Sequence, residues 1–362
     1  MSRFPFVKAS FPDPALTPRK IRTHLIDVQQ RLRDRRAAIH PPQDDTDRAD
    51  PAEELRLTER AHRRADTRAK RLHDDILRRS GLSHPNRDER EKLSVLRDGV
   101  GLVRIASEDR ADELAAVLHA EMPWMAPATG HAWQAMRRSV REGWPGFRLP
   151  PVILDGPPGI GKTRWARRLG GLIGAASMVI DAMGESASFG VTGCQRGWGS
   201  ARPGRVLELI MTDLTGNPIV VIDELDKAGS ARSNRDQSYG LAEGLLPLLE
   251  PATAADWTCP YYRLGFDMSF VGWILLTNSL QPLPEPLLGR CTVLRLQAVD
   301  LSDLIGFAER EGRARALSDS SIASITEALA AVAPGAATRP SLRTGLRMLD
   351  RAADLEHRPM VI

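Results

Sequence analysis

The sequence is poor in cysteine and in long apolar runs, and both shortages exclude classes of protein. The three cysteines, Cys194, Cys259 and Cys291, form no CxxC pair and have no matching histidine spacing, so we expect neither a disulfide framework nor a zinc site. The longest apolar run, at 268–277, is much shorter than the roughly 20 residues of a membrane-spanning helix. The first residues show no secretory signal pattern, so we expect no membrane contact and a cytoplasmic location.

Lysine is also scarce, since only six of the 50 basic residues are lysine. The net charge of +4 gives little support to nucleic-acid binding, because positive and negative residues are mixed along the chain. With 42% hydrophobic and 27% charged residues the composition is that of a globular protein. A chain of 362 residues exceeds one average domain, so we expect a core domain with one or two smaller units.

The N-terminal third predicts helices and one polar, turn-rich stretch. We expect residues 1–50 to be partly disordered, with a short helix at 19–38, and residues 51–122 to form a helical region. Asp50-Pro51-Ala52-Glu53 resembles a capping box, which predicts a helix that ends near residue 79, before Gly81. Its many arginines favour a solvated amphipathic helix, and a nucleic-acid-binding arm is the alternative.

The remainder of the chain predicts an α/β fold. Helical patterns at 86–97, 107–120 and 132–142 precede apolar runs at 152–154, 178–180, 219–222, 271–276 and 293–296. Runs without alternation suit strands covered on both faces, hence a parallel sheet between helices. After residue 300 only helical patterns remain. We therefore expect a nucleotide-binding core at 123–299 and a small helical lid at 300–362.

A phosphate-binding loop is the clearest motif. It follows an apolar run and precedes a helical pattern, as a G-x-x-x-x-G-K-[ST] loop requires. Glycines let successive backbone N–H groups face phosphates, while the lysine reaches the β and γ phosphates and the threonine binds Mg²⁺. ATP and Mg²⁺ are therefore the predicted ligands. The loop residues are Gly156, Pro157, Pro158, Gly159, Ile160, Gly161, Lys162 and Thr163.

A second acidic motif completes the predicted site. The apolar run 219–222 ends in Asp223 and Glu224. We expect Asp223 to reach the Mg²⁺ shell through water and Glu224 to polarise the attacking water. A strand that ends in two acids is common, but about sixty residues after a phosphate loop it indicates ATP hydrolysis rather than binding alone.

The chain resembles the AAA+ ATPase module of Lon-type proteases over about 123–350. The resemblance rests on GPPGIGKT, VIDELDK, LLPLLEPA, YYRLGFDMSFVGWILLTN and PEPLLGR. It implies that Asn278 is sensor 1, that Arg290 is an arginine finger and that Arg343 is sensor 2. A finger acts on a neighbouring subunit, so the resemblance also implies a ring, expected to be a hexamer.

The residues themselves leave alternatives to these roles. Asn278 follows an apolar strand and would emerge beside the phosphate loop, but it could start a turn. Arg290 and Arg343 could form surface salt bridges. Trp198 lies where Lon-type rings carry a pore loop that grips polypeptide. Its flanking glycines offer no rigid platform for core packing, which favours substrate contact over a core position.

The resemblance does not extend to the ends of the chain. A Lon protease uses a serine and a lysine for proteolysis, and no lysine follows Lys227, so we expect no peptidase activity of that kind. The leading hypothesis is an ATP-driven ring that remodels or threads a protein, with a separate effector as a further partner. A nucleic-acid-dependent machine and an ATP-gated switch that recruits a partner are the alternatives.

Overall fold

The structure is a computed structural model that describes residues 3–39, 59–183, 189–196, 201–228, 231–232, 238–331 and 340–356. The chain divides into two compact units. The smaller unit comprises Lys8–Arg97 and Tyr262–Leu264, and the larger comprises Met1–Val7, Asp98–Tyr261 and Gly265–Ile362. No helix in the described part of the chain is long and apolar enough to cross a bilayer.

A five-stranded parallel sheet forms the centre of the larger unit, in the order β2-β3-β8-β1-β9. The side chains of β8 and most of those of β1 and β3 are buried, as expected for strands covered on both faces. This sheet confirms the predicted fold class. The strands are β1 (Val152–Asp155), β2 (Ser177–Asp181), β3 (Ile219–Asp223), β8 (Gly272–Thr277) and β9 (Thr292–Arg295).

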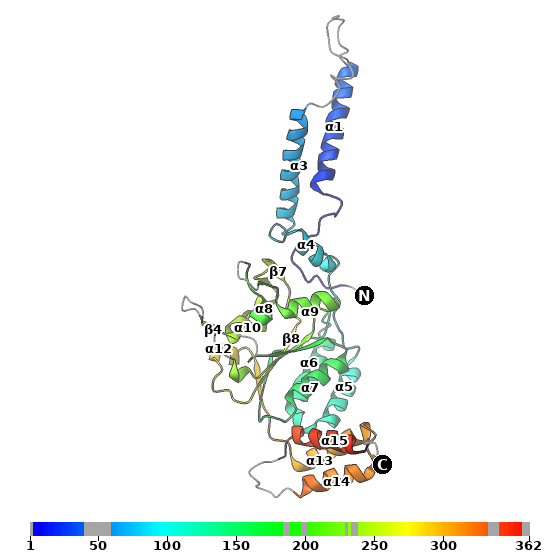
Figure 1. Cartoon of the computed structure of the whole chain (residues 1–362), viewed down its shortest axis with the longest axis vertical. Coiled ribbons are helices and arrows are strands. Elements are labelled where there is room, and N and C mark those ends of the chain that lie inside the picture. Colours follow the sequence, from blue (N-terminus) through cyan, green and yellow to red (C-terminus); the bar gives the residue numbers. More distant parts are fainter. Residues whose placement is uncertain are drawn as a thin grey trace, which may run out of the picture. The chain divides into compact units, whose positions relative to one another are not determined.

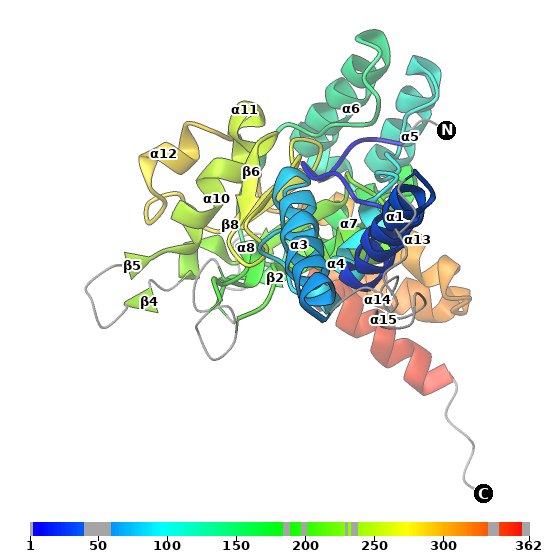
Figure 2. The ribbon, with the colours of Figure 1, turned by 90° about the horizontal axis from the view of Figure 1, so that it is seen from above.

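Three helices pack with the sheet around the main hydrophobic core, and they lie together in Figures 1 and 2. They are α5 (Glu108–Glu121), α6 (Ala126–Arg141) and α7 (Lys162–Ile173). Leu118 of α5, Met136 of α6 and Trp165 of α7 join Leu154 and Val221 of the sheet in this core. Helix α7, which follows β1 in the chain, is therefore fixed against the sheet.

Short helices and two strand pairs complete the described elements, and α10 contacts α8, α11 and α12. Helix α10 is almost wholly apolar on its inner side, with Leu241, Leu245 and Leu248 buried. The short elements are the 3₁₀ helices η2 (Pro123–Met125) and η3 (Leu225–Lys227), the helices α8 (Phe189–Thr192), α9 (Arg205–Asp213), α10 (Leu241–Leu249), α11 (Pro251–Ala254) and α12 (Glu285–Leu288), and the strand pairs β4 (Ala231–Arg232) with β5 (Ser238–Tyr239) and β6 (Trp257–Cys259) with β7 (Leu264–Phe266).

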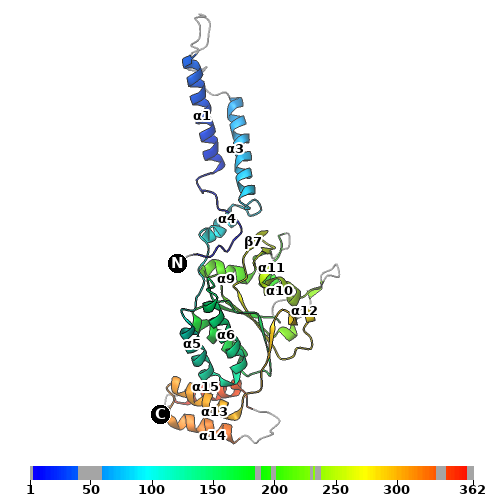
Figure 3. The ribbon, with the colours of Figure 1, turned by 180° about the vertical axis from the view of Figure 1, so that it is seen from behind.

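Three helices follow the sheet and form a second, smaller core. They are α13 (Leu301–Ala314), α14 (Asp319–Ala330) and α15 (Leu342–Glu356). Leu304 and Phe307 of α13 pack with Ile325 of α14 and Leu349 of α15. The helices expected after residue 300 are therefore present, and their grouping is visible in Figure 3.

The smaller unit is helical. Helix α1 (Pro18–Ile39) packs against α3 (Glu59–Arg79), and both precede α4 (Arg87–Leu93) and the 3₁₀ helix η1 (Ser94–Leu96). Helix α3 ends where predicted, before Gly81, whose φ of +80° suits glycine. The predicted start of α3, with the capping box at 50–53, lies outside the described residues.

Candidate functional site

The loop 156–161 connects β1 to α7 and takes a backbone path that needs glycine. Gly159 and Gly161 have φ of +79° and +90°, in the left-handed region that other residues rarely adopt. A Cβ on Gly161 would lie 2.7 Å from Leu342 Cδ2, closer than atoms can approach. The loop leads into the N-terminus of α7, where free backbone N–H groups and the helix dipole favour an anion.

Lys162 places a buried positive charge under this loop. Its Nζ donates to Thr277 O and Asn278 Oδ1, both at 2.9 Å, and to the carbonyls of Gly156 and Pro157. Burial lowers the pKa of the Lys162 ammonium below its ordinary value, and nearby negative charges, among them Asp223, oppose this shift. No carboxylate in the described part of the chain forms an ion pair with it. A buried cation without direct neutralisation is suited to binding phosphate.

Thr163 and Asp223 meet beside the lysine. The hydroxyl of Thr163 donates to Asp223 Oδ2 over 2.8 Å, so the first turn of α7 touches the end of β3. Hydroxyl and carboxylate oxygens are ligands that Mg²⁺ prefers, alongside water and phosphate. The two residues that the sequence proposes for Mg²⁺ therefore lie together and fit the ion.

Glu224 follows Asp223 with an unusual backbone conformation. Its φ is +56°, a region that is rare for residues other than glycine and is often found at functional sites. Its N–H donates to Asp223 Oδ1 over 2.9 Å, and its Oε1 accepts from Lys227 Nζ over 2.8 Å. The pair raises the pKa of Lys227. The half-exposed Glu224 carboxylate is thus held by Lys227 at the surface of the site.

Asn278 joins the lysine to the acidic segment. It follows β8, whose neighbours in the sheet are β1 and β3. Besides accepting from Lys162, it donates its backbone N–H to Asp226 Oδ1 at 3.3 Å. The structure therefore brings Asn278 to the phosphate loop, as the sensor 1 role requires, and that role stays a prediction.

The structure does not place the three remaining predicted residues, Arg290, Arg343 and Trp198, in contact with Lys162 or Asp223. Arg290 is exposed just after α12, where it donates to Pro286 O over 3.0 Å and lies 3.6 Å from Glu250. Arg343 is exposed in the first turn of α15, directly after Leu342, whose N–H donates to Gly159 O over 3.1 Å. Trp198 lies outside the described residues, so the pore-loop prediction stays untested.

Comparison with known proteins identifies the type of domain. Residues 152–298 match the family model described as "ATPase family associated with various cellular activities (AAA)". Residues 152–298, about two fifths of the chain, are therefore similar to this ATPase family. This assignment fits the loop, the buried lysine and the paired Thr163 and Asp223.

Lon proteases are among the sequence relatives of this chain. A mitochondrial Lon protease homolog of Phaeodactylum tricornutum is 31% identical over 178 residues, 49% of this chain and 20% of the relative. The Lon protease of Chloroherpeton thalassium is 30% identical over 164 residues, 45% of this chain and 19% of the relative. A peroxisomal Lon protease homolog 2 of Arabidopsis thaliana is 27% identical over 214 residues, 59% of this chain and 24% of the relative. The match covers only about a fifth to a quarter of these relatives, and it agrees with the Lon-type resemblance.

Trp124 contacts the phosphate loop from outside the matched range 152–298, and sequence reasoning missed it. Its indole Nε1 donates to Ile160 O in the phosphate loop over 2.8 Å, and its ring packs edge-on against Phe307 of α13 at 6.1 Å. It therefore touches both the loop and the C-terminal helices. No spacing rule could have identified it, because the contact joins residues 36 positions apart across an irregular segment.

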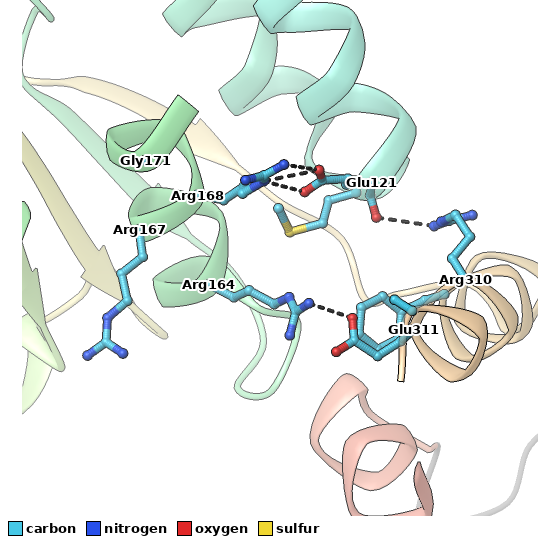
Figure 4. Close-up of a pocket in the computed structure, with 10 residues that line it drawn as sticks. Glu121, Arg164, Arg167, Arg168, Gly171, Arg310 and Glu311 are labelled. Carbon is cyan, nitrogen blue, oxygen red and sulfur yellow. Dashed lines mark hydrogen bonds and ion pairs between the residues drawn. The ribbon is translucent and has the colours of Figure 1, made fainter. Parts of the chain in front are cut away.

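A set of arginines joins α7 to α5 and α13, around the groove in Figure 4. Arg164 pairs with Glu311 at 2.7 Å, and Arg168 forms a two-pronged pair with Glu121. Arg310 donates to the backbone O of Glu121 over 3.1 Å. Helix α7 begins at the phosphate loop. The pair between Arg164 and Glu311 therefore connects the helix that follows this loop to α13.

Proposed function

We propose that this chain binds MgATP at the loop 156–163 and hydrolyses it. The observation that carries this proposal is the buried ammonium of Lys162, which lies under a glycine loop without an ion-pair partner in the described part of the chain. Thr163 and, through water, Asp223 would hold Mg²⁺, which offsets phosphate charge during phosphoryl transfer. Glu224 would then orient the attacking water and accept its proton.

The expected division of roles can be tested by two substitutions. Lys162→Ala should remove most ATP binding, because it deletes the buried cation. Glu224→Gln should leave binding intact and reduce turnover about 10²-fold or more, because only the acceptor of the water proton is lost. Binding of a fluorescent ATP analogue and phosphate release would be measured for both.

Two exposed residues provide matched controls. Lys92→Ala on α4 and Glu327→Gln on α14 make the same chemical changes away from the site, and both should behave as the unmodified protein. If Lys162→Ala and Glu224→Gln lost binding equally, or if Glu224→Gln turned over normally, the proposed roles would be wrong.

We further propose that ATP hydrolysis drives a ring, expected to be a hexamer, that remodels or threads a protein in the cytoplasm. Two features support a ring: the AAA domain, and the position of Arg290, which contacts Pro286 and Glu250 rather than the chain's own phosphate loop. The Lon relatives support a protein substrate. The helices after residue 300 are proposed as the lid of the nucleotide site, with Asn278 and Arg343 as its two sensors.

Whether the chain remodels proteins can be tested by measuring which added proteins increase its ATPase rate. Addition of an unfolded model protein to the full chain should increase the ATPase rate, whereas the same protein in its folded form should not. Stimulation by neither form, with ring formation intact in particle images, would contradict protein remodelling. It would favour the ATP-gated switch that recruits an effector.

A further inference from the structure

Helix α3 carries a row of arginines that the proposed ATPase mechanism does not use. The row follows the spacing of one helix face, with intervals of three and four residues. We call it the arginine stripe, and it lines a shallow groove on the helix surface. Its members are Arg60, Arg63, Arg64, Thr67, Arg68 and Arg71.

The arginine stripe lies on the side of α3 opposite its packing face. Ala65 and Ala69 are buried, and Asp66 between them pairs with Arg22 of α1 at 2.7 Å. The residues of the arginine stripe are all exposed. At 100° per residue the centres of the two faces are about 180° apart, so packing against α1 leaves the arginines accessible within this unit.

Most charges of the arginine stripe are not neutralised within the described chain. Arg63 pairs with Glu59 at 3.2 Å, whereas Arg60, Arg64, Arg68 and Arg71 form no ion pair or hydrogen bond with described residues. Like charges three or four residues apart repel one another on a helix. Helix α3 has eight basic and four acidic residues and α1 has seven and two, so the local charge is strongly positive although the chain's net charge is only +4.

The residue types in the arginine stripe restrict the kind of partner that it can bind. Guanidinium groups bind phosphate oxygens through two parallel hydrogen bonds. The stripe contains no aromatic residue that could stack on an unpaired base, as binding of single strands uses. It also contains no apolar residue that could enter a lipid surface, as interfacial helices require. A regular polyphosphate is therefore a better fit than a single strand or a membrane.

The length and shape of α3 fit a duplex. From Arg60 to Arg71 the helix rises about 16 Å, over which a DNA duplex presents one phosphate charge about every 1.7 Å. An α-helix also fits the major groove of B-DNA, which is about 12 Å wide. We propose that the arginine stripe of α3 binds the phosphate backbone of double-stranded DNA without sequence preference.

Salt dependence tests the proposal on the full chain. Binding of a fluorescein-labelled duplex of about 20 base pairs would be followed by anisotropy between about 50 and 200 mM salt. Five phosphate contacts predict a slope of log affinity against log salt of about −4.5. The triple variant Arg64→Gln, Arg68→Gln, Arg71→Gln should weaken binding at the lowest salt at least tenfold and make the slope shallower by about 2.7.

A second triple variant separates the stripe from general charge. Arg110→Gln, Arg138→Gln, Arg141→Gln removes three exposed arginines from α5 and α6 and changes net charge equally, and it should bind the duplex as the unmodified protein does. Both variants should keep the basal ATPase rate, which shows that they are folded. Lys162→Ala should bind the duplex normally, so failure of the ATPase proposal is distinguishable from failure of this one.

Several results would overturn the proposal. They are no binding of the duplex at 50 mM salt, equal losses in the two triple variants, or displacement of the duplex by polyglutamate at equal charge concentration. The last outcome would assign the stripe to an acidic polypeptide, and preferential binding of vesicles with anionic lipid would assign it to a membrane.

Discussion

Replacing Trp124 with phenylalanine removes one hydrogen-bond donor from the phosphate loop and leaves an aromatic ring in place. The indole N–H donates to the carbonyl of Ile160, a buried residue in the loop. The bond is partly buried, and loss of its donor costs at most about 1–3 kcal/mol, the range for a fully buried carbonyl. The phenylalanine ring can still pack against Phe307, so the larger cost of a cavity should not arise.

We expect this free-energy cost to destabilise mainly the conformation of the loop that binds phosphate. If the whole 1–3 kcal/mol opposes the binding-competent loop, affinity for ATP decreases by about 5- to 150-fold. We expect KM for ATP to rise within this range while kcat stays within about twofold, because Trp124 does not contact Glu224 or Asp223. At about 2–4 °C per kcal/mol for a large domain, the melting temperature should decrease by roughly 2–12 °C.

Trp133 provides the matched control. Its indole also donates a hydrogen bond, to Asp112 Oδ1 over 2.6 Å, but the side chain is exposed and lies on α6 away from the loop. Trp133→Phe should therefore change KM and the melting temperature little. If both substitutions had the same effect, or if Trp124→Phe left KM unchanged, the hydrogen bond would not be what holds the loop.

Three further predictions concern residues elsewhere in the larger unit. Arg290→Ala should fold and bind ATP but fail to hydrolyse it, and mixing it with Lys162→Ala subunits should restore some turnover; no recovery in demonstrated mixed rings would contradict a finger in trans. Trp198→Ala should keep basal ATPase and lose stimulation by unfolded protein, whereas a sharp drop in thermal stability of roughly 3–5 kcal/mol would mark a core residue instead. Burial raises the pKa of the Cys291 thiol to about 12, so less thiolate is present at pH 8 than for an ordinary cysteine, and maleimide labelling in the native protein should be much slower than after denaturation; equal rates would refute this.

The sheet and its phosphate loop could be predicted from sequence because their signals are local. Runs such as 219–222 are apolar throughout, since both faces of β3 are covered. The glycines and Lys162 follow directly after such a run, and Asp223 ends another. The sheet then brings these ends together, so Thr163 meets Asp223 without any further signal in the sequence.

The sequence predicted the bounds of an element less well where that element depends on contacts with residues distant in the chain. Helix α6 begins at Ala126, six residues before the predicted start, because Pro127 fits the first turn of a helix and the small residues Ala128 and Thr129 pack inward. The strands β6 and β7 have three residues each and were missed, since so short a run shows no period. Charge along α3 appeared mixed in sequence, but folding separates the arginine stripe from Asp66.

The hydrogen bond from Leu342 to Gly159 has a consequence for how the site is made in the cell. The two residues are about 180 positions apart. A ribosome that adds about 5–20 residues per second therefore synthesises the loop some 9–36 s before it adds Leu342. The last strand of the sheet, β9, ends at Arg295, so the complete sheet can form only about 2–9 s before Leu342 is added, while the loop still lacks the contact with α15 that the glycines accommodate. The contact between Leu342 and Gly159 is therefore among the last parts of the larger unit to be completed.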